Sequence, residues 1–272
     1  MKILITGSSG FVGSHLVNKL SKKHTVIGYD LVNKEDILDE KLLSKKLRGV
    51  DMVIHLAAFI SATESWEKPL DYMRNNTLGT LSVVDCAIKV GVKKMIFFSS
   101  AAVKAKPLTP YAISKINAEN ILSLYKNRMN IVIVRPENIY GPGQKANYGY
   151  VIHNFIKAVR SGDKINIYGN GKQTRDFVYV DDVVESIDSI IEKKIKNETL
   201  NIGTGNAVSI KYLAFLVCKI LKRKTPIQFK PARNEPRNSF ADVRTLSRVG
   251  IDYKKFKDVE EGIKDLLLRS HS

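Results

Sequence analysis

The stretch that decides the fold lies at the start of the chain: Lys2-Ile3-Leu4-Ile5-Thr6-Gly7-Ser8-Ser9-Gly10-Phe11-Val12-Gly13. Its apolar and β-branched residues from Ile3 onward predict a buried strand over Lys2–Thr6. The glycines follow the pattern G-x-x-G-x-x-G, which permits a tight turn and close approach of the backbone to a bound group. Phe11–Leu20 then repeats apolar residues at helical spacing. The stretch therefore predicts a strand, a glycine turn and a helix.

A glycine turn between a strand and a helix is suited to binding the pyrophosphate of a dinucleotide. The helix N-terminus supplies unpaired N–H groups and a partial positive charge for that anion. The next predicted strand, Thr25–Tyr29, is followed by Asp30, whose carboxylate can accept hydrogen bonds from the adenosine ribose. Because this carboxylate would repel a 2′-phosphate, the sequence favours NAD over NADP as the cofactor.

Short apolar runs alternate with helical patterns through the first half of the chain. The predicted strands are Lys2–Thr6, Thr25–Tyr29, Met52–Leu56, Met95–Phe98 and Ile131–Val134, and the predicted helices are Phe11–Leu20, Leu70–Val90 and Pro110–Tyr125. Continuous apolar strands separated by helices indicate a parallel sheet covered on both faces. We therefore predict an α/β fold with a Rossmann-type doubly wound parallel sheet.

The rhythm changes after Gly141, which suggests two domains. Residues 1–140 are predicted to form the NAD-binding Rossmann domain, to which a strand at 199–203 returns, and residues 141–272 to form a small C-terminal α/β subdomain. Helices are predicted there over Val151–Val159, Val183–Ile191 and Ile210–Leu221. The proline-rich segment Thr225–Asn238 is predicted to be irregular.

Composition and charge narrow the class of protein. The 272 residues carry 44 Lys and Arg against 27 Asp and Glu, a net charge of +17, which attracts polyanions. The basic residues are spread along the chain, in helix-like stretches such as Lys41–Arg48, so we interpret them as a solvated surface and expect no nucleic-acid partner. Cys86 and Cys218 are far apart, and no metal-ligand spacing, signal peptide or membrane span is visible. We expect a cytoplasmic protein that binds neither metal nor membrane.

A tyrosine and a lysine form the candidate catalytic pair. Tyr111 and Lys115 lie one helical turn apart, on one face of the predicted helix Pro110–Tyr125. Oxidation of an alcohol needs a base that takes the hydroxyl proton, and an ammonium group and a positively charged nicotinamide would lower the pKa of the tyrosine phenol toward that task. Ser99 and Ser100 end the preceding strand, and either hydroxyl could bond to the reacting group.

The Y-x-x-x-K spacing also occurs at Tyr168/Lys172 and Tyr253/Lys257. The first pair spans Gly169 and Gly171, which disfavour a helix, and the second lies near the C-terminus. Only Tyr111 opens a helix that follows a strand ending in serines, so the context selects it.

With these residues in hand, the chain resembles the NAD-dependent epimerase/dehydratase family of nucleotide-sugar enzymes, a branch of the extended short-chain dehydrogenases/reductases, and its pattern is most similar to the UDP-glucose 4-epimerases. The resemblance covers nearly the whole length. Its ordered blocks are Thr6–Gly13, His55–Ala58, Asn75–Thr80, Ser99–Val103, Tyr111–Lys115, Arg135–Gln144, Tyr168–Val178, Asn201–Gly203 and Glu235–Arg237.

The resemblance implies a role for each matching residue. Ser100 would hydrogen-bond the reacting sugar hydroxyl, Tyr111 would act as the base and Lys115 would hold the nicotinamide ribose. The implied cofactor-binding residues are Gly7, Gly10, Phe11, Val12, Gly13, Asp30, Asp36, Ile37, Leu56, Ala57, Ala58, Asn76, Ser99, Tyr111, Lys115 and Pro136. The implied substrate-binding residues, mostly in the C-terminal subdomain, are Ser100, Ala101, Asn138, Val151, Ile152, Arg175 and Arg233, with the two arginines on the diphosphate.

Within the family, dehydratases carry an Asp-Glu pair after the catalytic Ser or Thr, and decarboxylases usually keep a Glu. Here Ala101 and Ala102 stand at these positions and cannot transfer protons. The resemblance therefore implies a 4-epimerase, with UDP-glucose and UDP-galactose as substrates, that oxidises and re-reduces C4. It also implies a homodimer formed through the helices Leu70–Val90 and Pro110–Tyr125.

Two features depart from the family pattern. The short stretch from Asp30 to Asp36 has no room for the usual helix and strand, so the sheet should lack an edge strand. Only ten residues separate Ser100 from Tyr111, where relatives have a longer loop that walls the sugar pocket. Two alternatives stay open: a reductase of a 4-keto nucleotide sugar, and a non-enzymatic NAD-binding protein that uses its basic surface to bind a partner.

Overall fold

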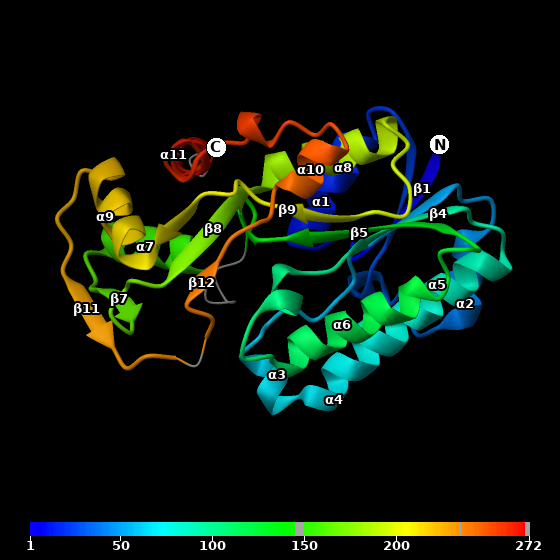
Figure 1. Ribbon diagram of the computed structural model, residues 1–272, viewed down its shortest axis with the longest axis horizontal. Coiled ribbons are helices and arrows are strands. Elements are labelled where there is room, and N and C mark those ends of the chain that lie inside the picture. The colour runs from blue at the N-terminus through cyan, green and yellow to red at the C-terminus, as the bar shows by residue number, and fades with distance from the viewer. Residues whose placement is uncertain (145–149, 234, 270–272) are drawn as a thin grey trace. The chain divides into compact units, whose positions relative to one another are not determined.

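The computed structural model describes residues 1–144, 150–233 and 235–269 (Figure 1). The chain divides into two compact units. The first comprises Met1–Arg135 and Val184–Leu200, and the second comprises Pro136–Val183 and Asn201–Ser272. The chain therefore passes from the first unit into the second after Arg135 and returns to the first for Val184–Leu200. It then enters the second unit again for its C-terminal part.

The first unit is built on a six-stranded sheet in the order β2-β1-β3-β4-β5-β9. The pairs among its first five strands are parallel. The six strands of the sheet are β1 (Lys2–Thr6), β2 (Thr25–Tyr29), β3 (Met52–His55), β4 (Lys94–Phe98), β5 (Asn130–Pro136) and β9 (Thr199–Ile202). The predicted α/β fold with a Rossmann-type sheet is confirmed. β2 forms one edge, as the short stretch after Asp30 predicted.

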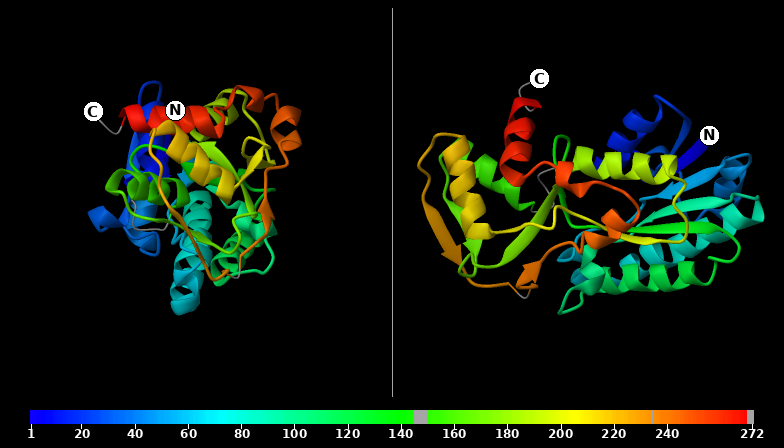
Figure 2. Two further views of the ribbon diagram at one scale, coloured as in Figure 1. Left: turned by 90° about the vertical axis from the view of Figure 1, so that its left-hand side faces the viewer. Right: turned by 45° about the horizontal axis from the view of Figure 1, so that its top comes forward.

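Helices cover both faces of this sheet (Figures 1 and 2). α1 (Phe11–Leu20) and α8 (Val180–Glu192) lie on one face, where Lys19 of α1 and Lys23 of the turn after it form ion pairs with three acidic residues of α8, Glu185, Asp188 and Glu192. α2 (Glu40–Leu47), α5 (Gly79–Lys89) and α6 (Pro110–Ser123) lie on the other face. Apolar side chains of the strands pack with those of α2, α5 and α6 and form a buried core. Strands with continuous apolar runs are typical of a sheet whose two faces are both kept from water.

The helix predicted over Leu70–Val90 is not one regular α-helix. After α3 (Glu64–Glu67), the chain forms α4 (Pro69–Tyr72), a π-helical segment η2 (Met73–Leu78) and then α5. Within the π-helical segment the Asn76 carbonyl accepts the hydroxyl proton of Thr80 at 2.6 Å. π-Helical turns are often found at functional sites, and hydrophobic periodicity does not distinguish them from an α-helix.

The second unit contains two smaller sheets. One has the order β10-β8-β12, with β6 also paired to β8, and the other pairs β11 with β7. The strands are β6 (Asn138–Tyr140), β7 (Ile165–Tyr168), β8 (Thr174–Tyr179), β10 (Ala207–Ser209), β11 (Ile227–Lys230) and β12 (Asn238–Ser239). The segment Thr225–Asn238 is thus not wholly irregular. Its residues Ile227–Lys230 pair in parallel with β7, between the prolines that suggested a loop.

Of the helices in the second unit, the first two lie at predicted positions and the last two were not predicted, while the helix predicted over Val183–Ile191 falls almost wholly in the first unit, as α8. The helices of the second unit are α7 (Val151–Ser161), α9 (Ile210–Ile220), α10 (Arg244–Arg248) and α11 (Val259–Arg269). α7 and α9 pack their apolar faces on β7 and β8, forming a second core separate from the first. None of the helices among the described residues combines the length and the apolar character needed to cross a bilayer.

Candidate functional site

The glycine turn after β1 forms a cradle into which side chains do not fit. Gly7 has a φ of +72°, and a Cβ there would lie 2.8 Å from the backbone nitrogen of Ala57. A Cβ on Gly13 would lie 2.1 Å from the carbonyl oxygen of Gly7. No side chain caps the N-terminus of α1 at Gly10, and its first turn carries no acidic residue. The exposed N–H groups and the helix dipole therefore fit the pyrophosphate of a dinucleotide.

Asp30 lies beside this cradle. Its carboxylate accepts hydrogen bonds from the backbone N–H groups of Ser9, at 2.8 Å, and Val32, at 3.1 Å. The acidic side chain is thus fixed next to the glycine turn, where the sequence predicted the adenosine ribose. Two further predicted cofactor-binding residues differ in exposure: Asp36 is exposed, whereas Ile37 is buried.

The segment after β3 runs along the same cradle. Leu56, Ala57 and Ala58 are partly exposed, and the Ala57 N–H donates to the Thr6 hydroxyl at 3.2 Å. Asn76, which is predicted to bind the cofactor, contacts the end of this segment. Its side chain is fully buried, and its amide bonds to both the N–H and the carbonyl of Phe59.

The Asn76 amide also donates to the Ser114 hydroxyl and accepts from the Asn75 side chain. Its hydrogen-bonding capacity is therefore used within the protein. We interpret Asn76 as a residue that holds the 56–59 segment in place, and a direct contact between its side chain and the cofactor would require breaking these bonds.

Tyr111 and Ser100 meet at the end of β4. Thr109 caps α6 by accepting from the Ala112 N–H, and Pro110 occupies the first turn, so Tyr111 is fixed near the helix start. Ser100 begins a short 3-10 turn, η3 (Ala101–Lys104), and its hydroxyl oxygen accepts from the Ala102 N–H at 3.1 Å. A hydrogen bond to Ser100 lowers the pKa of Tyr111, but burial of the phenol has the larger effect and raises it.

Lys115 lies one turn further along α6. Its Nζ is buried and donates to the Phe98 carbonyl at 2.9 Å. Burial lowers the pKa of Lys115 to about 7, an effect that the carboxylate of Glu119 opposes. Desolvation of the phenol exceeds the effect of Ser100, so the protein's own groups hold the pKa of Tyr111 above its usual value. The lowered pKa predicted from the sequence involves a bound nicotinamide and stays a prediction.

Ser99 and Arg135 share a partner that the sequence analysis missed. The Ser99 hydroxyl donates to Glu119 at 2.5 Å, and the Arg135 guanidinium forms an ion pair with the same carboxylate through two nitrogens. Pro136 follows as a buried residue at the end of β5. Glu119 could have been noticed, because it lies four residues after Lys115 and therefore on the same helical face.

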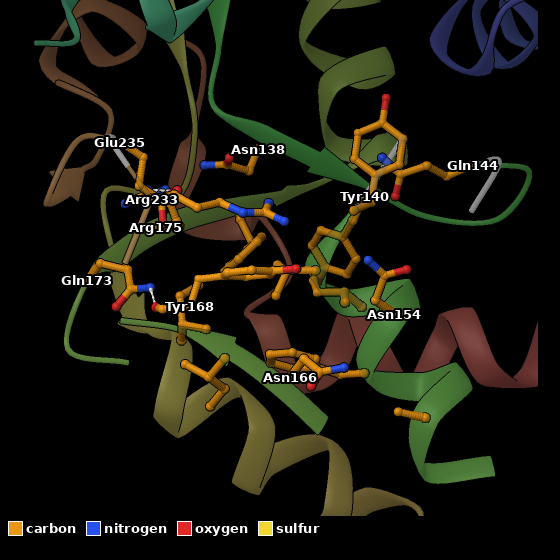
Figure 3. Close-up of a pocket in the computed structure, with 18 of the residues that line it drawn as sticks. Asn138, Tyr140, Gln144, Asn154, Asn166, Tyr168, Gln173, Arg175, Arg233 and Glu235 are labelled. Atoms are coloured by element: carbon orange, nitrogen blue, oxygen red, sulfur yellow. Dashed lines mark hydrogen bonds and ion pairs between the residues drawn. The ribbon is translucent and has the colours of Figure 1, made fainter. Parts of the chain in front are cut away.

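A pocket of about 410 Å³ lies within the second unit. All five substrate residues predicted there line it, namely Asn138, Val151, Ile152, Arg175 and Arg233. Figure 3 shows Arg175, Arg233 and Glu235 gathered at one side, near Tyr168. The Asn138 amide donates to the Asp176 carbonyl at 2.9 Å, which fixes its orientation.

The two arginines of this pocket are held by residues that the sequence analysis did not assign to a site. Arg175 donates to the Thr174 carbonyl and to the Glu235 carboxylate, both at 2.8 Å. The Arg233 guanidinium lies over the Tyr168 ring, 3.4 Å from its centroid. Tyr168 is the last residue of β7 and does not lie in a helix. The pair Tyr168/Lys172 is therefore not a candidate catalytic pair, as its glycines indicated.

Comparison with known proteins agrees with this geometry. The model of the "NAD dependent epimerase/dehydratase family" matches residues 3–203. A UDP-N-acetyl-alpha-D-glucosaminuronate decarboxylase of Bacillus cytotoxicus is 31% identical, over 98% of this chain and 96% of its own.

Two solved structures are similar over the full length. UDP-glucose 4-epimerase of Thermotoga maritima, with UDP-glucose, has a TM-score of 0.91 and 31% identity, covering 100% of this chain and 99% of its own. UDP-glucose 4-epimerase of Thermus thermophilus, in complex with NAD, has a TM-score of 0.91 and 26% identity, with the same coverage. The chain therefore belongs to the NAD-dependent epimerase/dehydratase family, and it is an NAD-dependent enzyme of nucleotide-sugar metabolism.

Proposed function

We propose that the protein is a nucleotide-sugar 4-epimerase that interconverts UDP-glucose and UDP-galactose. The observation that carries this proposal is the arrangement at the end of β4, where Ser100 acts on the pKa of the Tyr111 phenol and is followed by Ala101 and Ala102. The two alanine side chains cannot carry a proton to or from a neighbouring carbon. The site is thus equipped to exchange a proton at one hydroxyl, and it has no acid–base pair at these positions for eliminating water.

When bound, NAD supplies the acceptor and then the donor of a hydride at C4 of the sugar. Tyr111 would take the proton of the C4 hydroxyl as the hydride leaves C4, so that this carbon becomes a ketone, and Ser100 would hydrogen-bond the same oxygen. Tyr111 then returns the proton when C4 is reduced on its other face. Each unit by which burial raises the pKa of the phenol costs about 1.4 kcal/mol, so Lys115 must contribute positive charge beside it.

The pocket of the second unit would hold the nucleoside diphosphate of the same substrate. Arg175 and Arg233 are planar cations suited to bidentate contacts with a diphosphate. Val151 and Ile152 lie at the start of α7, and the nucleobase would lie beside them. A diphosphate held at its oxygen atoms leaves the 4-keto sugar free to turn, which a 4-epimerase requires. In this proposal the first unit binds NAD and the second binds the nucleotide.

A homodimer through α4, α5 and α6 is part of the proposal. α6 contacts both α4 and α5 within the first unit, and large apolar side chains are exposed on these helices and directly beside them. Leu70 is 82% exposed, Leu124 is 78% exposed, and Leu78 and Ile113 are also exposed. Burial against a second copy would remove this apolar surface from water. Replacing Leu70 and Leu124 together by Asp should convert a dimer into a monomer in light scattering; a wild-type monomer at all concentrations would contradict the dimer.

The direct test of the function is incubation with UDP-galactose and measurement of UDP-glucose. The wild-type protein should reach the same mixture from either sugar, with no net consumption of nicotinamide. Tyr111→Phe should lower kcat by about 10² to 10⁴, the usual contribution of a general acid–base group, and leave NAD binding largely intact. Tyr72→Phe is a matched control, because that buried ring lies edge-on to Tyr111 at 6.3 Å. Stoichiometric consumption of a reduced nicotinamide with a 4-keto sugar, without epimerisation, would instead identify a reductase.

A further inference from the structure

Three residues on one face of α6 meet three successive residues at the end of β4. Tyr111 lies near enough to Ser100 for that hydroxyl to lower the pKa of its phenol, Lys115 donates to the Phe98 carbonyl, and Glu119 accepts from the Ser99 hydroxyl. The three α6 residues are spaced by four positions, so each lies one turn after the last. The end of β4 is therefore attached to the catalytic helix by two hydrogen bonds, at Phe98 and Ser99, directly before Ser100.

Glu119 is the member of this set that belongs to no known step of the reaction. Its side chain is 11% exposed and is paired with Arg135, which is 22% exposed. The guanidinium holds the carboxylate from the end of β5, with Nε to Oε1 at 2.8 Å and a second contact from Nη2 to Oε2. A bidentate pair of this kind fixes the orientation of the carboxylate, and removing one partner leaves the other charge largely without compensation.

The charges around Lys115 come from few groups. On β3, His55 is buried and carries a pKa lowered to about 3, first by burial and then by Lys115 itself, so its ring is neutral at pH 7. On β4, the Phe97 ring lies 4.9 Å from the Lys115 Nζ. On α6 there are the Tyr111 phenol and the Glu119 carboxylate, and β5 contributes Arg135, which neutralises that carboxylate. Glu119 opposes the loss of the proton that burial promotes at Lys115.

We propose that Glu119 is a positioning residue for the proton-transfer pair: it fastens the Ser99–Ser100 corner to α6 and balances the positive charges of Lys115 and Arg135. Tyr111 and Lys115 would then depend on a carboxylate that touches neither substrate nor cofactor. This inference rests on the proposed function, because it assigns Glu119 a role through the residues that carry the reaction.

The electrostatic part can be measured without any reaction. In protein labelled with ¹³C-lysine, the chemical shift of the Lys115 Cε, assigned with Lys115→Arg, reports its protonation as the pH is raised. Glu119→Gln keeps an acceptor for Ser99 but leaves Arg135 as an uncompensated cation, so the midpoint should fall by at least about one pH unit, a tenfold change in the equilibrium constant. Arg135→Gln leaves an uncompensated carboxylate and should raise the midpoint.

The double variant Glu119→Gln/Arg135→Gln removes both charges and should return the midpoint toward that of the wild type. A matched control is Glu260→Gln, which breaks another carboxylate–cation pair of the chain, with Lys264 on α11. It should leave Lys115 unchanged. Midpoints that stay fixed, or that move in the same direction in both single variants, would overturn the inference, because loosened packing alone gives no change of sign.

The pH profile of turnover supplies the second measurement. A less charged Lys115 favours the phenolate of Tyr111 less, so Glu119→Gln should lower kcat about tenfold near neutral pH and move its acid limb to higher pH. Arg135→Gln should move that limb to lower pH, and KM should change little in either. If the wild-type protein epimerises no nucleotide sugar, the proposed function fails, whereas the Lys115 titration still decides whether Glu119 controls its charge.

Discussion

The imidazole of His55 lies between the hydroxyl groups of Thr6 and Thr80, with Nδ1 2.6 Å from Thr6 Oγ1 and Nε2 3.0 Å from Thr80 Oγ1. The Thr80 hydroxyl donates its proton to the Asn76 carbonyl, so it can only accept from the ring. The pattern of bonds thus assigns the ring proton to Nε2, while Nδ1 accepts from Thr6. His55 is a neutral buried link between β1, β3 and the first turn of α5.

This neutral ring predicts a loss of stability in acid. Burial lowers the pKa of His55 from 6.5 to about 3, so between these values the unfolded chain binds a proton that the folded chain does not. The contribution of the neutral His55 ring to the free energy of unfolding is complete above pH 6.5. It is lost as the pH falls toward 3, at about 1.4 kcal/mol per pH unit.

His55→Gln, which does not titrate, should be less stable than the wild type at pH 7 but lose less stability between pH 6.5 and 4. Urea unfolding at several pH values measures this. Equal slopes for the two proteins would show that His55 is not the group responsible.

The glycine cradle predicts two different defects from two similar substitutions. Gly13→Ala places a methyl group 2.1 Å from the Gly7 carbonyl oxygen, so it should destabilise even the cofactor-free protein by about 1–3 kcal/mol or more. Gly10→Ala meets only that same oxygen, at 3.2 Å, and should leave the cofactor-free fold nearly as stable.

The Gly10→Ala methyl group would nevertheless stand where the backbone must approach the pyrophosphate, so NAD affinity should fall. Urea unfolding and NAD titration separate the two effects. Normal NAD binding by Gly10→Ala would contradict the position assigned to the pyrophosphate.

The first unit could be predicted from the sequence nearly element by element, because apolar strands and glycine punctuation are local signals. The strand Lys2–Thr6 and the helix Phe11–Leu20 have the predicted bounds. The π-helical segment could not be predicted, since it depends on where the Asn76 and Thr80 side chains find partners. β11 was missed for a similar reason: Ile227–Lys230 is a strand because β7 lies beside it, not because of its own composition.

The diphosphate role of Arg175 predicts a defect in substrate binding. Arg175→Lys keeps the charge but cannot make bidentate contacts, and it weakens the pairing with Glu235. Loss of about 1.5–3 kcal/mol in charged hydrogen bonds corresponds to a rise in KM for UDP-galactose of roughly 10- to 100-fold.

NAD affinity should not change in Arg175→Lys. Arg244→Gln is the matched control in the same unit, because that side chain is 88% exposed and pairs with Asp242. An unchanged KM in Arg175→Lys would remove this residue from the substrate site.

The carboxylate of Asp30 predicts the choice of cofactor. Asp30→Ser removes the negative charge that would face a 2′-phosphate, so the ratio of NADP to NAD affinity should rise by at least about tenfold. Calorimetric titration with both cofactors measures the ratio. Asp39→Ser is a control: serine can cap α2 as aspartate does, so stability should change little and the ratio should stay unchanged. A constant ratio in Asp30→Ser would place the ribose elsewhere.

The candidate site was predicted unevenly. Tyr111, Lys115 and Ser100 could be selected because a strand end and a helix start bring them together in the fold. Glu119 and Glu235 were missed, because their importance comes from the cations they meet, Arg135 and Arg175, which are distant in sequence. For Glu119 the sequence offered one signal, its position one helical turn after Lys115. The direction of the pKa change at Tyr111 also depends on burial, which the motif alone does not contain.

The most direct test of the account follows the hydrogen on C4. UDP-galactose carrying deuterium at C4 is incubated with the protein, and the UDP-glucose formed is analysed by mass spectrometry and NMR. If Tyr111 exchanges only the hydroxyl proton and C4 is re-reduced within the same site, the product keeps its deuterium at C4. Product that carries hydrogen from solvent at C4, or no product from protein shown to contain NAD, would contradict the account.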